Sequence, residues 1–480
     1  MIRERSCLSD NVVQMLTSRI FKLPQSTQNV LKLASCFGPH FDVRALDMAK
    51  SALGVDCVYK SLQEALEQEF VLQLDSTKYK FSHQLIQFAA CGLSPEAIEL
   101  RQVHFDIGSL LMKDNELLKD DDSVLFATVD HLNEGPEFVG DDSKASVANL
   151  SYLAGTKAAT LSAFAQSASY AKAGIEILGS NAFDLHHDLA LQLYQLCAKA
   201  KDCLGKIDDA RFCAEQVIEH AHSWEEKKPS ILVMMACFKS ENKIQELLDF
   251  GLGVLGSLGE DKPKDASATQ AAWECRKMKH WVKHVPTNFL RSLPAMSVIT
   301  KDLAVKTLCE LNLPLCKLGQ ERLVTLAVCR MASLTKRHGV CQATPEAFAL
   351  GGVHLVYNGH NVSQGHKLGE IALDILKKQG ANKERSACVS QLVAANLKWW
   401  CDPTPKCLDL LTTGAFSQSQ PRPSPRLLSN DGLPCLMFLK NKFAVIFFQP
   451  TKTPWRRAPP MQRFRLPWPT ESTASAVGCH

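Results

Sequence analysis

Helical periodicity without strand-like alternation is the feature that most constrains this chain. From residue 84 to about residue 400, apolar side chains recur three and four positions apart, with small residues at close-packing positions. Helices of this kind bury their apolar stripes by packing against one another. With 480 residues, the chain exceeds the roughly 50 to 200 residues of one ordinary core. We therefore predict an all-α protein built from several helical units or from a repeat array.

Two consecutive units in this region have the residue pattern of helix-turn-helix repeats. The first unit has Leu153, Ala154, Gly155, Lys157, Ala158, Ala168, Tyr170, Gly174 and Leu178. The second has Leu191, Tyr194, Ala198, Leu204, Gly205, Ala210 and Ile218, with a turn expected at Asp208-Asp209. Their spacing is looser than the strict repeat of about 34 residues in a regular tetratricopeptide array. We predict degenerate tetratricopeptide-like repeats over residues 93–275.

Further helical pairs are expected over residues 276–405, at residues 304–311, 323–334, 345–357 and 364–376. In the last pair, one set of small and apolar residues should face another across the turn 358–361, whose residues tolerate the positive φ that it needs. The facing sets are Ala347, Leu350, Gly351 and Val353 on one helix, and Gly365, Leu368, Ala372 and Leu376 on the other. Together with residues 93–275, these pairs predict a tetratricopeptide-like α-solenoid.

The region before the repeats has a different order of elements. Val30, Leu33, Ala34 and Phe37 mark a first helix that ends at Gly38-Pro39. Second and third helices are expected after the caps Asp42 and Asp56. Alternating residues at 70–74 and 79–81, joined by a turn at Asp75-Ser76, predict a small hairpin. Three helices followed by a hairpin indicate a winged-helix-like domain over residues 21–92.

Winged helices often bind DNA through the third helix, but this one is acidic. Between residues 56 and 69 its charged residues are Asp56, Lys60, Glu64, Glu67 and Glu69, a net charge of −3. Such a helix would repel phosphate groups. A packing or interdomain role is therefore favoured over a DNA-binding regulator.

The net charge of +4 comes from the last part of the chain. Residues 411–480 hold nine Lys or Arg against Asp431 and Glu471, so they carry +7. Subtraction leaves 45 basic and 48 acidic residues before them, a net of −3, which offers no overall attraction for nucleic acid. Frequent prolines, serines and arginines predict a disordered tail over residues 406–480, with residues 443–448 as a candidate strand that lacks a partner nearby.

The sequence shows no signal for membrane insertion, secretion or metal binding. The longest apolar runs are shorter than the roughly 18 residues that cross a bilayer, and the first residues lack the apolar core of a secretory signal. The 18 cysteines stand singly without a Cys-x-x-Cys pair, many of them on apolar stripes, for example Cys36, Cys197, Cys213 and Cys329. We predict a cytoplasmic protein with reduced thiols, no metal and no membrane contact.

Three motifs suggest chemistry, and each fails on its context. Residues 54–61 resemble a phosphate-binding loop, but Tyr59 replaces its second glycine and no buried strand precedes it. Asp249-Phe250-Gly251 matches a kinase tripeptide, yet it continues a helical stripe and no His-Arg-Asp loop precedes it. The single histidines have no carboxylate or cysteine at triad or ligand spacing, which favours capping or core roles, and His186-His187 point in different directions. The single histidines are His83, His104, His131 and His338.

Several separated segments, in this order, resemble the region that follows the AAA-type ATPase domain in large signalling ATPases of the STAND class. That class includes fused serine/threonine kinases and multi-sensor hybrid histidine kinases. The matching segments are residues 23–28, 34–41, 81–90, 130–135, 150–158, 253–259 and 334–339, with Trp399. The resemblance covers roughly residues 8–405, although Gln84 replaces the aspartate that usually follows the histidine of the closing strand.

The resemblance implies a remnant of an ATPase lid helix at residues 1–20, a winged helix that docks on an ATPase domain, and helical repeats that bind a partner or hold the ATPase inactive. No P-loop, Walker B carboxylate, kinase core or phosphoacceptor domain occurs in the sequence. We therefore expect a non-catalytic regulatory and protein-interaction region, a fragment without catalytic, cofactor-binding or metal residues. Its expected partner is an ATPase or kinase domain in the same or another chain. The alternative is a free-standing tetratricopeptide-like scaffold or adaptor.

Overall fold

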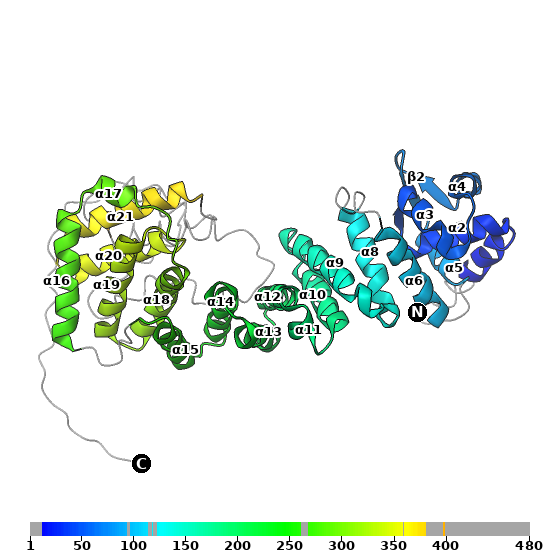
Figure 1. Ribbon diagram of the computed structural model, residues 1–480. Coiled ribbons are helices and arrows are strands. Elements are labelled where there is room, and N and C mark those ends of the chain that lie inside the picture. Colours follow the sequence, from blue (N-terminus) through cyan, green and yellow to red (C-terminus); the bar gives the residue numbers. More distant parts are fainter. Residues whose placement is uncertain are drawn as a thin grey trace, which may run out of the picture. The chain divides into compact units, whose positions relative to one another are not determined.

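The computed structural model describes residues 12–93, 97–113, 118, 122–260, 267–358, 360–380 and 397–398. Within these ranges the protein is helical apart from one small sheet (Figure 1). The all-α, solenoid-like class predicted from the periodicity is confirmed. The predicted disordered tail, the candidate strand at 443–448 and Trp399 lie outside the described residues.

The N-terminal unit has the predicted order of helices and hairpin. Residues 12–20 are helical, and the unit continues with helices, one short 3-10 helix and strands. In chain order these are α2 (Gln25–Cys36), β1 (His40–Asp42), α3 (Val43–Ala49), η1 (Lys50–Leu53), α4 (Val58–Glu67), β2 (Val71–Gln73), β3 (Lys78–Phe81) and α5 (Gln84–Cys91). The hairpin of β2 and β3 thus follows the third helix, α4, as the sequence predicted.

The sheet contains a strand that the sequence pattern did not predict. β3 lies in the middle and pairs antiparallel with both β1 and β2. In β1, Phe41 lies opposite Tyr79, and the two rings stack with centroids 6.1 Å apart. β1 is only three residues long, too short for alternation to stand out. Its last residue, Asp42, caps α3 as predicted, accepting a hydrogen bond from the amide of Arg44.

The core of the N-terminal unit continues into the next helix of the chain. Helix α6 (Ala97–Leu111) places Ile107 and Leu111, both fully buried, in one cluster with the residues of α2, α3 and α4. The ring of Phe37, just after α2, meets the edge of His131 with centroids 4.9 Å apart. A cut at the predicted boundary of residues 92 and 93 would therefore divide a shared hydrophobic core.

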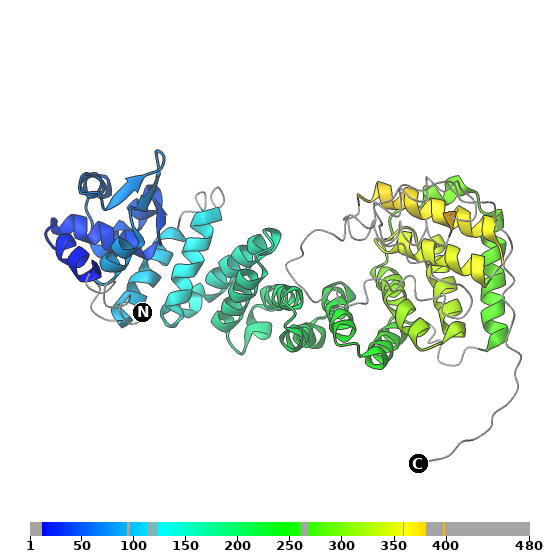
Figure 2. The same cartoon turned by 180° about the vertical axis from the view of Figure 1, so that it is seen from behind.

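The middle of the chain is a succession of antiparallel helical pairs (Figures 1 and 2). Each of the long helices packs against the next along the chain, with the short η2 (Pro136–Phe138) between the first two. The helices are α8 (Asp122–Glu134), α9 (Asp141–Thr160), α10 (Phe164–Leu178), α11 (Ala182–Leu185), α12 (His187–Cys203), α13 (Ile207–His220), α14 (Trp224–Ser240) and α15 (Ile244–Ser257). The two repeat units predicted from small residues correspond to α9 with α10 and to α12 with α13.

The last part of the described chain continues the pairing with one interruption. α18 (Ile299–Lys317) pairs with α19 (Glu321–His338), and α20 (Thr344–Tyr357) pairs with α21 (Val362–Lys378). α18 packs directly on α15, although α16 (Ala268–His284) and α17 (Thr287–Arg291) come between them in the sequence. α16 lies instead along α19 and α21 (Figures 1 and 2). The predicted boundary at residue 275 lies inside α16.

Two local predictions about turns and caps are wrong. The residue that precedes α4 is Cys57 and not Asp56, and no side chain caps that helix. Asp208 and Asp209 lie in the first turn of α13, where their carboxylates face the positive end of the helix, and the turn itself is made at Gly205 with φ of 70°. In both cases the helix starts within two or three residues of the predicted position, and such shifts are common at helix ends.

The pair α20 and α21 approaches most closely at two glycines. A methyl group added to Gly352 would lie 2.7 Å from the backbone oxygen of Gly365. The facing predicted for these helices is confirmed, since a methyl group added to Gly351 would lie 3.4 Å from Leu368. In the turn between them, His360 has a positive φ of 51°. Only glycine at both 352 and 365 lets the two backbones meet at this distance.

Replacing Gly352 with alanine should therefore destabilise the protein. The methyl group would push the two backbones apart, which we expect to cost about 1 to 3 kcal/mol of unfolding free energy. Gly253→Ala in α15 is the matched control, since nothing lies within 4 Å of its added methyl group. It should be neutral or stabilising by up to about 1 kcal/mol, because alanine favours helix. Urea unfolding of both variants tests this, and equal midpoints would contradict it.

One buried carboxylate joins three helices of this region. Glu260, just after α15, is 2% exposed and accepts hydrogen bonds from Lys301 Nζ of α18 and Arg330 Nε of α19, both at 2.7 Å. Burial alone would raise the pKa of Glu260, but the hydrogen bonds and charges of the two cations outweigh it. The pKa therefore lies below its ordinary value of 4.5.

Glu260→Gln should cost about 1 to 3 kcal/mol, because two cations would lose their counter-charge at a site where one partner is buried. Because the folded pKa is depressed, the stabilisation by Glu260 is present above about pH 4.5 and is lost as the pH falls below that value. Glu176→Gln, which breaks an exposed pair with Lys172, should cost less. Thermal unfolding between pH 3 and 7 measures both, and an unchanged acid limb in Glu260→Gln would refute the assignment.

Candidate protein-interaction groove

The segment that resembles a phosphate-binding loop forms no such loop. Gly54 ends η1 in a left-handed conformation with φ of 59°, so a helix and not a strand precedes it. Val55 and Val58 point into the core, while Tyr59 is 55% exposed. The amides that would cradle a phosphate are thus placed at the start of a packed helix.

The kinase-like tripeptide lies inside α15, as the helical stripe predicted. A methyl group on Gly251 would lie 2.7 Å from Leu311 of α18, so this glycine serves close packing. Phe250 packs against Phe238 of α14 with ring centroids 5.7 Å apart. Asp249 meets the amide of Gln245 on the helix surface.

The single histidines take structural positions. His83 caps α5 by accepting a hydrogen bond from the amide of Leu85. His131 is 3% exposed, and its Nδ1 lies 2.7 Å from Nδ1 of His104. Burial lowers the pKa of both rings, that of His131 to about 3. His338 lies in the last turn of α19, where a cation is favourable.

The acidic third helix, α4, uses one of its carboxylates inside the unit. Glu64 accepts a hydrogen bond from the hydroxyl of Thr27 on α2. Within the described residues, no three His, Cys, Asp or Glu side chains come together as a metal site. No helix there is long and apolar enough to cross a membrane.

The open groove between α16 and α19 is where cations and aromatic rings gather. α16 begins at Ser267, whose hydroxyl accepts a hydrogen bond from the amide of Gln270. Its Met278 and Val282 are buried against α19 and α21, which fixes the helix in place. The groove has a volume of about 410 Å³, with Met278 and Cys329 among its lining residues. We call this surface the α16–α19 groove.

Two tryptophans of α16 line the groove, each with a lysine over its ring. Lys277 Nζ lies 5.8 Å from the ring centroid of Trp273, and Lys336 Nζ from α19 lies 5.3 Å from that of Trp281. Trp273 is 57% exposed. The quadrupole of an indole ring attracts a cation that lies over its face, and at an exposed site the cation stays largely hydrated. The rings therefore hold the ammonium groups at the mouth of the groove.

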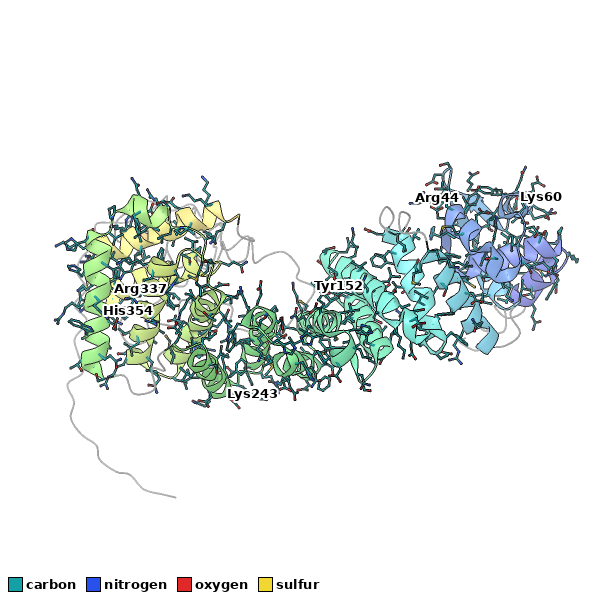
Figure 3. All side chains as sticks on the ribbon, in the orientation of Figure 1. Arg44, Lys60, Tyr152, Lys243, Arg337 and His354 are labelled. Atoms are coloured by element: carbon teal, nitrogen blue, oxygen red, sulfur yellow. The ribbon has the colours of Figure 1, made fainter. Side chains whose placement is uncertain are left out.

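The groove is cationic in a body whose formal charge is negative. Arg276, Lys277, Lys336 and Arg337 line it together with one carboxylate, Glu274, which leaves a net charge of +3. Arg337, labelled in Figure 3, lies in the last turn of α19. Glu274 pairs with Lys277 at 2.6 Å. Within the part of the chain that the structure describes, the other three cations have no carboxylate within 4 Å.

Sequence reasoning did not identify this groove. A signal was present, because Trp273, Lys277 and Trp281 are four residues apart and so share one side of a helix. The partner helix, however, lies about fifty residues further along the chain. Local periodicity carries no information about which distant helix covers a given face.

Comparisons with known proteins give limited similarity. The chain is 19% identical over 449 residues to hybrid signal transduction histidine kinase G of Dictyostelium discoideum; the match covers 77% of this chain and 13% of the kinase. No protein-family model matches. A STAND protein with a tetratricopeptide repeat sensor from Pyrococcus horikoshii, known from a crystal structure, aligns with 85% of this chain and 64% of its own, at 11% identity and a TM-score of 0.26. A likeness that weak does not bear on the fold.

The buried histidine pair makes stability depend on pH. Because the folded pKa values of His104 and His131 are depressed, the unfolded chain binds more protons below about pH 6.5. Stability should be full above that pH and fall as the pH drops toward 4, by up to about 1.4 kcal/mol per pH unit for His131, whose pKa is about 3, with His104 adding to the fall.

His131→Met removes one of these titrating rings and keeps an apolar side chain in the core. The slope of unfolding free energy against pH between 6.5 and 4 should then become shallower. Urea unfolding at several pH values checks this, with pH 8 giving the cost of the substitution itself. An unaltered slope would show that the imidazole pair does not control the acid response.

Proposed function

We propose that this chain is a non-catalytic regulatory and protein-interaction region of a STAND/AAA-type signalling ATPase or an associated kinase. The observation that carries the proposal is the succession of tetratricopeptide-like helical pairs from α9 to α21. Stacked pairs present long exposed faces, which proteins use to bind other proteins. The similarity to a signalling histidine kinase over most of this chain supports the signalling context.

The proposal assigns the two regions different tasks. The winged-helix-like unit would dock on an ATPase domain, and the helical pairs would bind a partner or keep that ATPase inactive. The core shared between α6 and the N-terminal unit supports such a division, because Ile107 and Leu111 tie the docking unit to the array. A partner bound on the array could then bias the docked state without any chemical step in this chain.

A free-standing scaffold or adaptor is the second candidate. It is favoured by the same helical pairs, which bind partners in adaptors without any ATPase. The two candidates differ in whether an ATPase or kinase domain lies beside α2 to α8. Under the first candidate the catalytic domains belong to sequence outside this chain, in keeping with the 13% of the related kinase that the chain covers.

Cross-linking of the native protein distinguishes the two candidates. Exposed lysines of the N-terminal unit, such as Lys60 and Lys78, should form cross-links to a P-loop ATPase or kinase domain, identified by mass spectrometry of the purified native assembly. An antibody against residues 150–250 detects the native polypeptide in cell extract and so gives its size. A band near 53.0 kDa whose N-terminal lysines link to no such domain would favour the adaptor.

The control is the purified chain itself, assayed for ATP hydrolysis and phosphotransfer. Activity that follows the protein through purification and vanishes on a substitution inside the described residues would refute the non-catalytic assignment. Cross-links from the N-terminal unit to an ATPase, with no activity of the chain alone, would support it.

A further inference from the structure

The cations of the α16–α19 groove exceed what the fold needs. Lys336 and Arg337 lie in the last turn of α19, where they stabilise the negative helix end. That effect does not apply to Arg276 and Lys277, which lie in the middle of α16. The stabilisation of helix ends also does not explain why the half-exposed Trp273 lies beside these cations. A surplus of positive charge around an exposed indole is suited to a ligand that supplies both carboxylates and an apolar group.

A lipid surface does not fit this groove. A helix that lies on a membrane inserts its apolar face between the lipids. In α16 that face is already buried, with Met278 at 1% and Val282 at 0% exposure against α19 and α21. What α16 presents to solvent is its charged side with Trp273.

Single-stranded nucleic acid fits poorly as well. Its bases bind by stacking on free aromatic faces. Here an ammonium group lies over each indole, Lys277 over Trp273 and Lys336 over Trp281. The net charge of −3 before residue 411 also gives a phosphate chain no attraction beyond the groove.

We propose that the α16–α19 groove binds an acidic segment of a partner protein. Its carboxylates pair with Arg276, Lys336 and Arg337, and an apolar side chain between them lies against the exposed part of Trp273 that Lys277 does not cover. The two tryptophans are eight residues apart, about 12 Å along the helix, which an extended segment of about four residues spans. This inference rests on the proposed function only in that the ligand is a protein.

Glu274 acts in this site as an internal competitor. Its carboxylate holds Lys277 at 2.6 Å, where a partner's carboxylate would otherwise bind. Neutralising Glu274 therefore frees Lys277 for the ligand. A purely structural role of the cations predicts no such gain, which makes Glu274 the sharpest test position.

The probe is a short fluorescent peptide of glutamates around one phenylalanine, with a benzophenone for photocross-linking. Binding to the full chain is measured by anisotropy at two salt concentrations, because exposed charge pairs weaken with salt. The cross-linked residue is mapped by mass spectrometry, since residues 411–480 carry +7 and offer a second cationic region. We expect cross-links to α16 and α19.

The variants separate the groove from general charge. Arg276→Glu with Arg337→Glu should weaken binding on the order of tenfold, and Glu274→Gln should tighten it about two- to fivefold. Lys199→Glu with Lys206→Glu, at two exposed positions, makes the same charge change of −4 and should leave the affinity unchanged. Equal thermal midpoints confirm that the variants fold.

Several results would overturn the inference. They are cross-links confined to residues 411–480, equal binding of a peptide with glutamine for glutamate, no loss in the double variant, or tighter binding of RNA or of phosphatidylserine vesicles. None of these touches the proposed function, which fails instead if the chain alone has ATPase or kinase activity. The two failures are therefore distinguishable.

Discussion

Glycine at the crossing points of the helices is the constraint on which the array depends. At four crossings a leucine of a neighbouring helix lies where the glycine has no side chain, so an added methyl group would come within 2.9 Å of it. The pairs are Gly108 with Leu132, Gly155 with Leu196, Gly174 with Leu193, and Gly251 with Leu311. Each leucine belongs to a different helix from its glycine. α12 supplies two of these leucines, one to α9 and one to α10, so the crossings with glycine help to fix which helices pack together along the array.

That constraint also joins one pair to the next. The cluster that contains Leu247 and Leu255 of α15 includes Leu308 of α18, Met331 of α19 and Ala347 of α20. No single pair closes this core, because each supplies one side of it. Stability is therefore shared between neighbours, as in repeat proteins generally. Glu260 adds a directional contact at the same junction, where an apolar core alone would leave the helices free to slide.

The sequence was informative wherever a signal is local. Helical spacing predicted α2, the pairing of α20 with α21 and the helical position of Gly251, since each depends on residues a few positions apart. β1 was missed because three residues cannot show alternation and its partner β3 lies about forty positions away. The groove was also missed because its partner is distant in the sequence: α16 packs against α19 and α21. Nothing in residues 268–284 specifies that partner.

The detour of α16 has a consequence for biosynthesis. A chain made from its N-terminus exposes α16 before α19 and α21 exist. Until they emerge, Met278 and Val282 have no surface to cover them, although α15 and the helices before it can already pack. Until then, the charged side of α16, with Arg276, Lys277 and Lys283, favours the solubility of this amphipathic helix. Arg276 and Lys277, which line the groove in the finished protein, thus also stand where gatekeeper charges oppose aggregation during synthesis.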